Sequence, residues 1–209
     1  MLTEKIAYHL CLKPILNVPK FDRIVSAMKT NLIKPFKEYR FRRIIIIGCP
    51  GSGKSTLGVE LGKILNLEVI HLDRLFWKKG WVESSKDEFD RKVEYALKKP
   101  SWIIDGNYLR TMKKRMEFSD LIIYLDYDTD ICLDSYYKRV EEKSIIANGF
   151  ITEGCVEEID SEFIDYIKNY NSKNREINYQ LIDESNKKWI VFSSREEKNS
   201  FIQELLLDY

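Results

Sequence analysis

Histidine and cysteine are scarce in this sequence of 209 residues, which contains two histidines and four cysteines. No two cysteines lie at the short spacing of a zinc ligand pair or a disulfide framework, so we expect free thiols and no structural transition-metal site. Long apolar runs are also missing. The longest aliphatic runs, Ile44–Ile47 and Leu121–Leu125, fall far short of the roughly 18 residues that a membrane-spanning helix needs. We therefore expect no transmembrane segment and no membrane partner.

The beginning of the chain lacks the basic-then-apolar layout of a secretory signal, because Lys5 and His9 interrupt its first apolar stretch. We therefore expect a cytoplasmic protein. The composition is 44% apolar and 32% charged, which is typical of a soluble globular chain. The length suits one hydrophobic core with one appendage.

Basic residues are concentrated at the start of the chain. Residues 1–43 contain ten Lys or Arg against three Asp or Glu, whereas the remainder contains 24 against 30. Such a segment can attract nucleic acid or an acidic partner. The helical spacing of Ile24, Met28, Leu32 and Ile33 instead favours a helix packed on the main domain. We therefore predict a basic helical extension over residues 1–41, and contact with nucleic acid is the less favoured interpretation.

From Arg42 onward, short β-branched or aromatic-rich segments alternate with amphipathic stretches, which is typical of a parallel sheet covered by helices. Five segments are predicted as strands: Arg43–Ile47, Glu68–His71, Trp102–Ile104, Leu121–Leu125 and Trp189–Phe192. Six are predicted as helices: Lys54–Leu65, Ser84–Leu97, Asp130–Lys143, Ile159–Tyr170, Arg175–Ser185 and Glu196–Leu207. The polar stretch Asn148–Gly154 predicts a mobile loop.

The segment from Gly48 to Thr56 satisfies the pattern G-x-x-x-x-G-K-[ST] between a predicted strand and a predicted helix. Its glycines can adopt backbone angles denied to other residues, so N–H groups converge on phosphate oxygens at the positive end of the helix. Lys54 adds charge for the phosphates, and Ser55 is the predicted ligand of Mg²⁺. We predict a loop that holds ATP, or a close relative, with Mg²⁺, through Gly48, Pro50, Gly51, Ser52, Gly53, Lys54, Ser55 and Thr56.

Other motifs narrow the class of phosphate-loop protein. The guanine-reading pattern Asn-Lys-x-Asp is absent, since the nearest run, Asn186–Trp189, lacks its aspartate. A transporter-type Leu-Ser-Gly-Gly signature is also missing, and the chain is too short for a helicase. A kinase that acts on a small molecule remains.

Two acids follow predicted strands at the carboxyl edge of the sheet, where ligands bind in such folds. Asp105 ends a buried strand and is predicted to support Mg²⁺ or its water, as a Walker-B acid does. Asp73 is predicted to orient or deprotonate an acceptor hydroxyl. For both residues, capping of the following helix is the alternative. We interpret Asp126, after the fourth strand, as structural.

Phosphoryl transfer also needs cations around the moving phosphate. Arg110 is favoured for its position after the third strand and Arg139 for its place before a predicted lid, with Arg115 and Arg175 less favoured. The stretch Leu75–Trp81 interleaves aromatic residues with lysines. Those aromatic rings either stack on a ligand or pack in the core, and the sequence leaves both readings open.

Several motifs together resemble the DNA topology modulation protein family, which is similar to adenylate kinase. They are the phosphate loop, His71-Leu72-Asp73, Phe76-Trp77, Gly80-Trp81-Val82, Trp102 to Tyr108 and Glu153-Gly154-Cys155. The resemblance implies an adenylate-kinase-like, three-layer α/β fold with a five-stranded parallel sheet over residues 42–209 and a lid near residues 138–158. It also implies ATP binding and kinase activity on an undefined acceptor.

The resemblance has departures in the lid. Where the family pattern has arginines, this chain has Ser135, Asn148 and Glu158, so fewer cations would close over the γ-phosphate. Arg139 keeps its place. The turn that carries Ser194 and Arg195 corresponds to the one that holds adenine in adenylate-kinase-like proteins.

We therefore predict an ATP-dependent kinase of the nucleoside or nucleotide type, monomeric or homodimeric. The predicted catalytic residues are Lys54, Asp73, Asp105, Arg110 and Arg139. The alternative is a regulatory nucleotide-binding protein, or a slow ATPase associated with nucleic acid, which the basic extension and the depleted lid favour.

Overall fold

The structure is a computed structural model that describes residues 41–142 and 149–207. The chain divides into two units between Glu38 and Tyr39, and all described elements belong to the second unit. The helical extension predicted over residues 1–41 lies outside the described residues, except for Phe41, whose side chain is buried. Among the helices of the described ranges, none combines the length and the apolar character needed to cross a bilayer.

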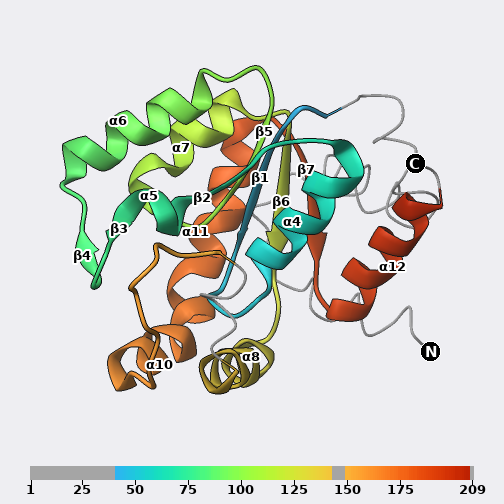
Figure 1. Cartoon of the computed structure of the whole chain (residues 1–209). Coiled ribbons are helices and arrows are strands. Elements are labelled where there is room, and N and C mark those ends of the chain that lie inside the picture. The colour runs from blue at the N-terminus through green and yellow to red at the C-terminus, as the bar shows by residue number, and fades with distance from the viewer. Residues whose placement is uncertain (1–40, 143–148, 208–209) are drawn as a thin grey trace, which may run out of the picture. The chain divides into compact units, whose positions relative to one another are not determined.

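Five parallel strands form the central sheet in the order β2-β5-β1-β6-β7 (Figure 1). Strand β1 (Arg43–Gly48) is central, between β5 (Trp102–Asp105) and β6 (Leu121–Leu125). Strands β2 (Val69–His71) and β7 (Lys188–Phe192) form the edges. The inner strands are buried on both faces, which explains their continuous apolar sequences. The predicted five-stranded parallel sheet is confirmed, with strand ends within one residue of the predicted ones.

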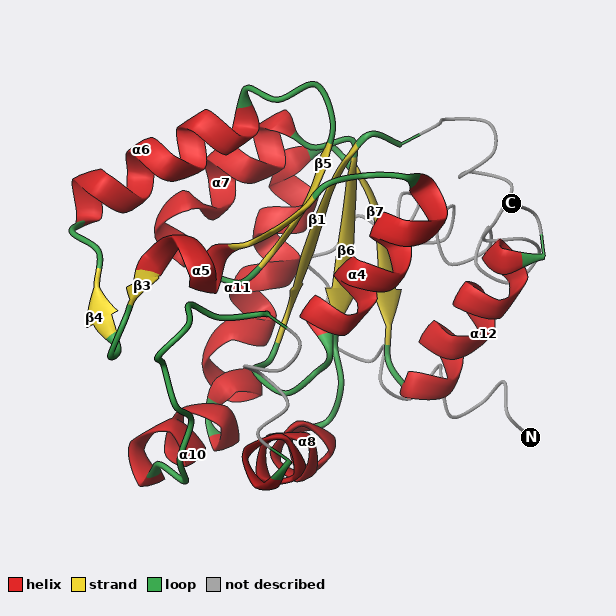
Figure 2. Cartoon of the chain, in the orientation of Figure 1, coloured by secondary structure: helices red, strands yellow, loops and turns green. Residues whose placement is uncertain are grey.

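Helices cover both faces of this sheet (Figure 2). Helices α4 (Lys54–Leu65) and α12 (Arg195–Leu206) contact each other over one face. Helices α6 (Lys86–Leu97), α7 (Leu109–Phe118) and α11 (Tyr170–Ser185) lie over the other. The three-layer α/β fold is thereby confirmed.

The remaining elements gather near the carboxyl ends of the strands. Helices α8 (Thr129–Glu141) and α10 (Ser161–Lys168) contact each other there (Figure 1). The short helix α5 (Leu72–Phe76) follows β2 directly and leads into a hairpin of β3 (Trp77–Lys78) and β4 (Val82–Glu83). This hairpin and α5 were not predicted, because segments of two to five residues are too short to establish a periodicity.

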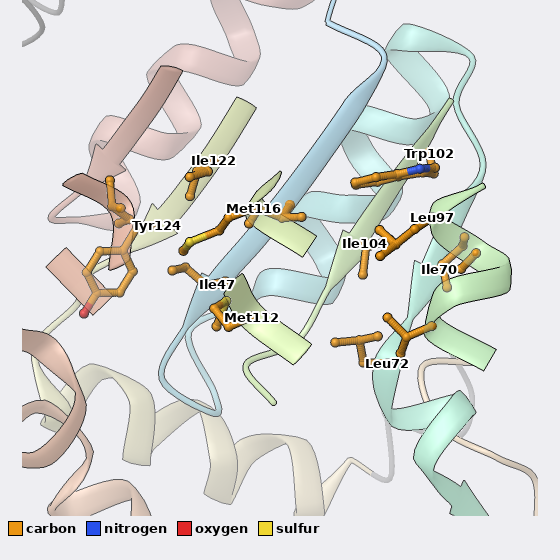
Figure 3. Close-up of a cluster of buried hydrophobic side chains, with 14 of the residues drawn as sticks. Ile47, Ile70, Leu72, Leu97, Trp102, Ile104, Met112, Met116, Ile122 and Tyr124 are labelled. Atoms are coloured by element: carbon orange, nitrogen blue, oxygen red, sulfur yellow. The ribbon is translucent and has the colours of Figure 1, made fainter. Parts of the chain in front are cut away.

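The main core lies between the sheet and helices α6, α7 and α11 (Figure 3). Strand β1 alternates across the sheet, since Ile45 and Ile47 belong to this core whereas Ile46 lies on the side of α4, beside Gly58. Met112 and Met116, one turn apart on α7, complete the packing against the strands. The core thus fixes the strand ends that carry the site.

Helix α7 was not predicted, because its buried face does not show a regular apolar pattern in the sequence. Only Met112 and Met116 are large apolar residues on that face, and the fully buried Arg115 lies between them. A charged residue at a core position breaks the apolar pattern that sequence reasoning depends on. Helix α11 also begins at Tyr170, five residues before the predicted start at Arg175.

The loop predicted to be mobile spans Asn148–Gly154. Asn148 lies outside the described residues, and the rest of the loop is anchored by contacts with the β3–β4 hairpin. Ile151 and Cys155 are buried and pack with Trp77 of the hairpin. Thr152 Oγ1 donates to the carbonyl of Trp77 at 2.5 Å, and Cys155 Sγ donates to the carbonyl of Lys78 at 3.2 Å. Contacts between distant segments therefore hold this part of the loop, and its mobility stays a prediction.

Candidate active site

A cavity of about 1190 Å³ opens at the carboxyl edge of the sheet. The phosphate loop forms its floor, the residues that follow β2 and β5 line one end, and α12 lines the other. Helices α8 and α10 and residues 150–158 contribute the remaining wall. One space therefore contains most of the side chains that the sequence predicts to be functional.

The phosphate loop has the backbone geometry that an anion cradle needs. Gly51 and Gly53 have φ angles of 82° and 89°, so both adopt the left-handed region. Gly53 precedes the first turn of α4 without a capping side chain, which leaves that turn's N–H groups without a side-chain acceptor. The hydroxyl of Ser52 is buried and has no partner among the described residues. These unpaired donors fit phosphate oxygens.

Lys54 lies at the centre of this cradle. Its Nζ donates to the carbonyls of Gly48 at 3.0 Å and Cys49 at 2.9 Å, and no described carboxylate lies within ion-pair distance. Burial lowers the pKa of Lys54, while the charges of Asp73 and Asp105 act in the opposite direction. A buried ammonium without a carboxylate partner is an energetic cost that a bound phosphate would remove.

Asn107 holds the first residue of the loop. Its Oδ1 accepts from the N–H of Gly48 at 3.0 Å, and its Nδ2 donates to the carbonyl of Gly48 at 2.6 Å. Both hydrogen-bonding groups of Gly48 are thus satisfied by one side chain. Gly48 itself does not line the cavity, so its contribution is to end β1 and position the loop.

Asp105 lines the cavity and is almost fully buried. His71 Nδ1 lies 2.8 Å from Asp105 Oδ2, so the imidazole fixes one carboxylate oxygen and leaves the other available. Asp105 does not cap a helix, since Tyr108 occupies the N-cap position of α7. Within the described ranges no group of three His, Cys, Asp or Glu side chains could hold a metal by itself. A Mg²⁺ here would therefore need phosphate oxygens as ligands besides Ser55 and Asp105, which suits a metal carried by a nucleotide.

Asp73 lies in the first turn of α5 and also lines the cavity. Its Oδ1 accepts from the hydroxyl of Tyr108 at 2.7 Å, and it makes no capping bond to the helix. Burial raises the pKa of Asp73, the bond from Tyr108 opposes that shift, and the neighbouring Asp105 adds to it. A carboxylate with a raised pKa and one oxygen unoccupied is suited to accept a proton.

Arg115 supports the turn that carries Asn107 and Tyr108. Its guanidinium is fully buried and donates to the carbonyls of Gly106 at 2.9 Å, Asn107, and Tyr108 at 3.3 Å. Arg115 therefore acts as a scaffold for the turn and does not face the cavity.

Arg139 and Arg195 bring cations to the cavity from opposite directions. Arg139, on α8, donates through Nε to Glu157 at 2.8 Å, and its guanidinium lies 5.5 Å from the ring centre of Tyr136. Arg195, at the start of α12, donates to the carbonyl of Ile131 at 3.2 Å and to the hydroxyl of Ser135. The carboxylate partner of Arg139 neutralises its charge, whereas Arg195 has only neutral partners among the bonds described.

Other predicted residues are not brought to the cavity. Arg110 is exposed and ion-paired with Asp90 at 2.6 Å, so we leave it out of the site. Arg175 donates to Asp126 at 2.7 Å and also lies outside the lining. Ser194 caps α12 by accepting from the N–H of Glu197 at 3.2 Å. The remaining predicted residues line the cavity: Pro50, Gly51, Ser52, Gly53, Lys54, Ser55, Thr56, Asp73, Asp105, Arg139 and Arg195.

Sequence reasoning assigned no role to four residues that shape this site: His71, Asn107, Tyr108 and Glu157. His71, Asn107 and Tyr108 lie at or just after the ends of strands, and this position was the available signal. Their partners lie 34, 59 and 35 residues away along the chain, and only the fold reveals those pairings.

Residues 44–165 match the protein family described as AAA domain. The chain belongs to this AAA domain family. The match runs from β1 to α10 and includes the phosphate loop, Asp73, Asp105 and Arg139. The AAA domain thus contains most of the cavity, whereas Arg195 on α12 lies beyond it.

One relative by sequence and two solved structures are similar to this AAA domain protein. The adenylate kinase isoenzyme 6 homolog of Plasmodium falciparum (isolate 3D7) is 28% identical over 153 residues, which is 61% of this chain and 81% of the relative. The solved shikimate kinase from Acinetobacter baumannii, in complex with shikimate, has a TM-score of 0.51 and 14% identity over 84% of this chain and 96% of its own. Deoxyadenosine kinase from M. mycoides with bound dATP has a TM-score of 0.49 and 16% identity over 79% and 98%. The likeness to the shikimate kinase shows that the chain shares the fold of this kinase.

Proposed function

We propose that this protein is an ATP-dependent phosphotransferase that moves the γ-phosphate of ATP onto a hydroxyl group of a small molecule. The observation that carries the proposal is the position of Asp73. This carboxylate opens on the same cavity as the phosphate loop, and it has no cation partner at ion-pair distance in the described part of the chain. Transfer to a hydroxyl group needs a proton acceptor beside the phosphate loop, and Asp73 is placed to supply one.

Each side chain then has one role in the transfer. Lys54 would hold the β- and γ-phosphates, and Ser55 and Asp105 would hold Mg²⁺, which would supply positive charge against the charge that develops on the phosphate. Asp73 accepts the proton of the acceptor hydroxyl while its oxygen bonds to the γ-phosphorus. The bond from that phosphorus to the β-phosphate oxygen breaks, and ADP leaves. Arg195, whose described partners are neutral, contributes positive charge, whereas Glu157 offsets the charge of Arg139.

The proposal also includes a more specific family for this chain within the adenylate-kinase-like kinases. The relative named as an adenylate kinase isoenzyme 6 homolog supports an adenylate-kinase-like kinase. Membership in the DNA topology modulation protein family rests on the motifs from His71 to Tyr108 and from Glu153 to Cys155. The alternative of a nucleic-acid-associated ATPase rests on the depleted lid and on residues 1–41, of which the structure describes only Phe41.

The test is transfer of labelled γ-phosphate from ATP·Mg²⁺ to a panel of nucleosides, nucleoside monophosphates and small hydroxylated metabolites. We expect transfer to one class, reduced at least about 100-fold by Lys54→Ala and by Asp73→Asn. Asp73→Asn should leave the ATP-induced thermal shift intact, because the residue lies on the acceptor side. Transfer that survives Asp73→Asn, or a panel without any acceptor despite ATP binding, would contradict the proposal.

A further inference from the structure

The sheet order separates the two substrates along the cavity. The phosphate loop follows the central strand β1. Arg195, Lys198 and Asn199 of α12, the helix after β7, line one end of the cavity. Asp73 follows β2 at the opposite edge of the sheet. The acceptor therefore lies at the β2 end, which we call the acceptor end. It is lined by residues of α5, the β3–β4 hairpin and residues 150–160, and by Lys138 and Arg139 near the end of α8.

The charges at the acceptor end are predominantly negative. Five carboxylates line it, namely Asp73, Glu83, Glu157, Glu158 and Asp160. The described cations that line it are Lys138 and Arg139. Lys138 is 74% exposed and lies 3.8 Å from Glu142, and Arg139 is bonded to Glu157 through both Nε and a terminal nitrogen. Lys138 is therefore mostly in solvent, and Glu157 offsets the charge of Arg139.

A phosphate on the acceptor would meet unfavourable conditions here. Phosphate recognition relies on arginine or lysine donors that face the ligand. At this end a dianion would meet more described carboxylates than cations, and like charges disfavour a ligand. An uncharged acceptor avoids this repulsion.

Aromatic side chains form the apolar part of the acceptor end. The ring centres of Trp77 and Trp81 are 5.3 Å apart and those of Phe76 and Trp77 are 4.8 Å apart, in edge-to-face arrangements. Trp81 is fixed by its Nε1, which donates to the carbonyl of Val156 at 2.7 Å. Phe150 joins them in the lining. A fixed group of rings provides faces and edges against which a planar heterocycle stacks.

We infer that the acceptor is an uncharged nucleoside, whose base packs against Trp77, Trp81 and Phe150 and whose sugar hydroxyl faces Asp73. The inference rests on the proposed function and makes it specific, because nucleoside 5′-monophosphates would be excluded. The hydroxyl oxygen forms the bond to the γ-phosphorus, the proton moves to Asp73, and ADP leaves with the electrons of the broken P–O bond. The product is a nucleoside monophosphate.

The first experiment measures kcat/KM for adenosine, guanosine, cytidine, thymidine and each 5′-monophosphate with ATP·Mg²⁺. We expect the preferred nucleoside to exceed its own monophosphate by at least about 100-fold, because of like-charge repulsion. Equal or better use of the monophosphate overturns the inference and leaves the proposed phosphotransferase standing. Transfer only to a hydroxyl compound of another class does the same. No transfer to any acceptor overturns both.

A charge variant tests the role of Glu157. Glu157→Gln removes the counter-charge of Arg139, so the kcat/KM ratio of monophosphate to nucleoside should rise about tenfold. Glu141→Gln removes a carboxylate that is exposed on α8 and does not line the cavity, and it should leave the ratio unchanged. A ratio that is unchanged in Glu157→Gln, or equally raised in both variants, overturns the inference.

An aromatic variant tests the base-binding part. Trp81→Ala should raise KM for the nucleoside about tenfold and leave KM for ATP unchanged, since base stacking contributes at this scale. The control is Tyr95→Ala on α6, an aromatic residue that is 72% exposed and outside the lining. Equal effects on the two KM values, or no effect, overturn the assignment of the base to these rings.

Discussion

Tyr108 connects the turn after β5 with the carboxylate after β2. Its hydroxyl donates to Asp73 at 2.7 Å, and its backbone has a φ of 32°, in the left-handed region that non-glycine residues seldom occupy. Its ring packs against Phe76 and Phe89, which holds the hydroxyl in position. Burial and the neighbouring carboxylate raise the pKa of Tyr108, so the phenol stays protonated and donates to Asp73.

We predict that Tyr108→Phe moves the acid limb of the kcat/KM profile to higher pH. Burial raises the pKa of Asp73 and the bond from Tyr108 lowers it, so removal of that bond raises it further. Asp73 must be ionised to accept a proton, and activity is therefore lost from low pH upward while the alkaline plateau is retained. The measurement is kcat/KM against pH for the wild type and the variant.

Tyr95→Phe is the control for this profile, because Tyr95 is exposed on α6 and has no part in the cavity. A lowered plateau in Tyr108→Phe with an unmoved acid limb would assign Tyr108 a purely structural role.

Among the elements, the phosphate loop and α8 are in direct contact. A Cβ added to Gly51 would lie 2.2 Å from the backbone carbonyl oxygen of Cys132, whereas a Cβ on Gly53 would meet nothing within 4 Å. The two glycines have similar φ angles of 82° and 89°. Alanine variants of these two glycines can therefore be compared to distinguish the effect of a positive φ angle from the effect of contact with α8.

We predict that Gly53→Ala lowers the free energy of unfolding by about 1 kcal/mol through the positive φ alone. Gly51→Ala should lower it by about 2 kcal/mol more, because the loop or α8 must move to accommodate the methyl group. Urea denaturation without nucleotide measures both values. Equal losses would indicate that α8 does not constrain the loop.

Some helices, strands and loops could be predicted from the sequence, and others could not. The apolar run Ile44–Ile47 and the motif that ends in Lys54 and Ser55 are local signals, and both gave correct elements. Helix α7 escaped prediction because Arg115 occupies a core position. The bonds of Asn107 to Gly48, and of Arg195 to Ser135, join residues 59 and 60 positions apart, so no local pattern indicates them.

At the scale of the whole molecule, every described residue that lines the cavity lies between Pro50 and Asn199. We predict that the unit Tyr39–Tyr209 binds ATP with the affinity of the full chain, within about twofold, because this unit contains the whole described lining. Titration calorimetry with ATP·Mg²⁺ measures both affinities.

A second truncation locates the start of this unit. Beginning at Arg42 removes Phe41, which is 8% exposed, and should lower the free energy of unfolding by about 2 kcal/mol relative to the unit that begins at Tyr39. Loss of ATP affinity in the longer unit would mean that residues 1–38 contribute to the site.

The side chain of Asn107 hydrogen-bonds to Gly48 of β1, so strand β5 can end at Asp105 while the backbone N–H and C=O of Gly48 stay paired. The primary amide of Asn107 has an N–H donor and a C=O acceptor, as a peptide group does. Here it takes the place of a backbone partner for Gly48 at the end of the strand pair. The main chain beyond Asp105 is therefore released from the sheet, and Arg115 receives its carbonyls. This substitution of side chain for backbone allows one turn to touch the ATP end and the acceptor end of the cavity at once.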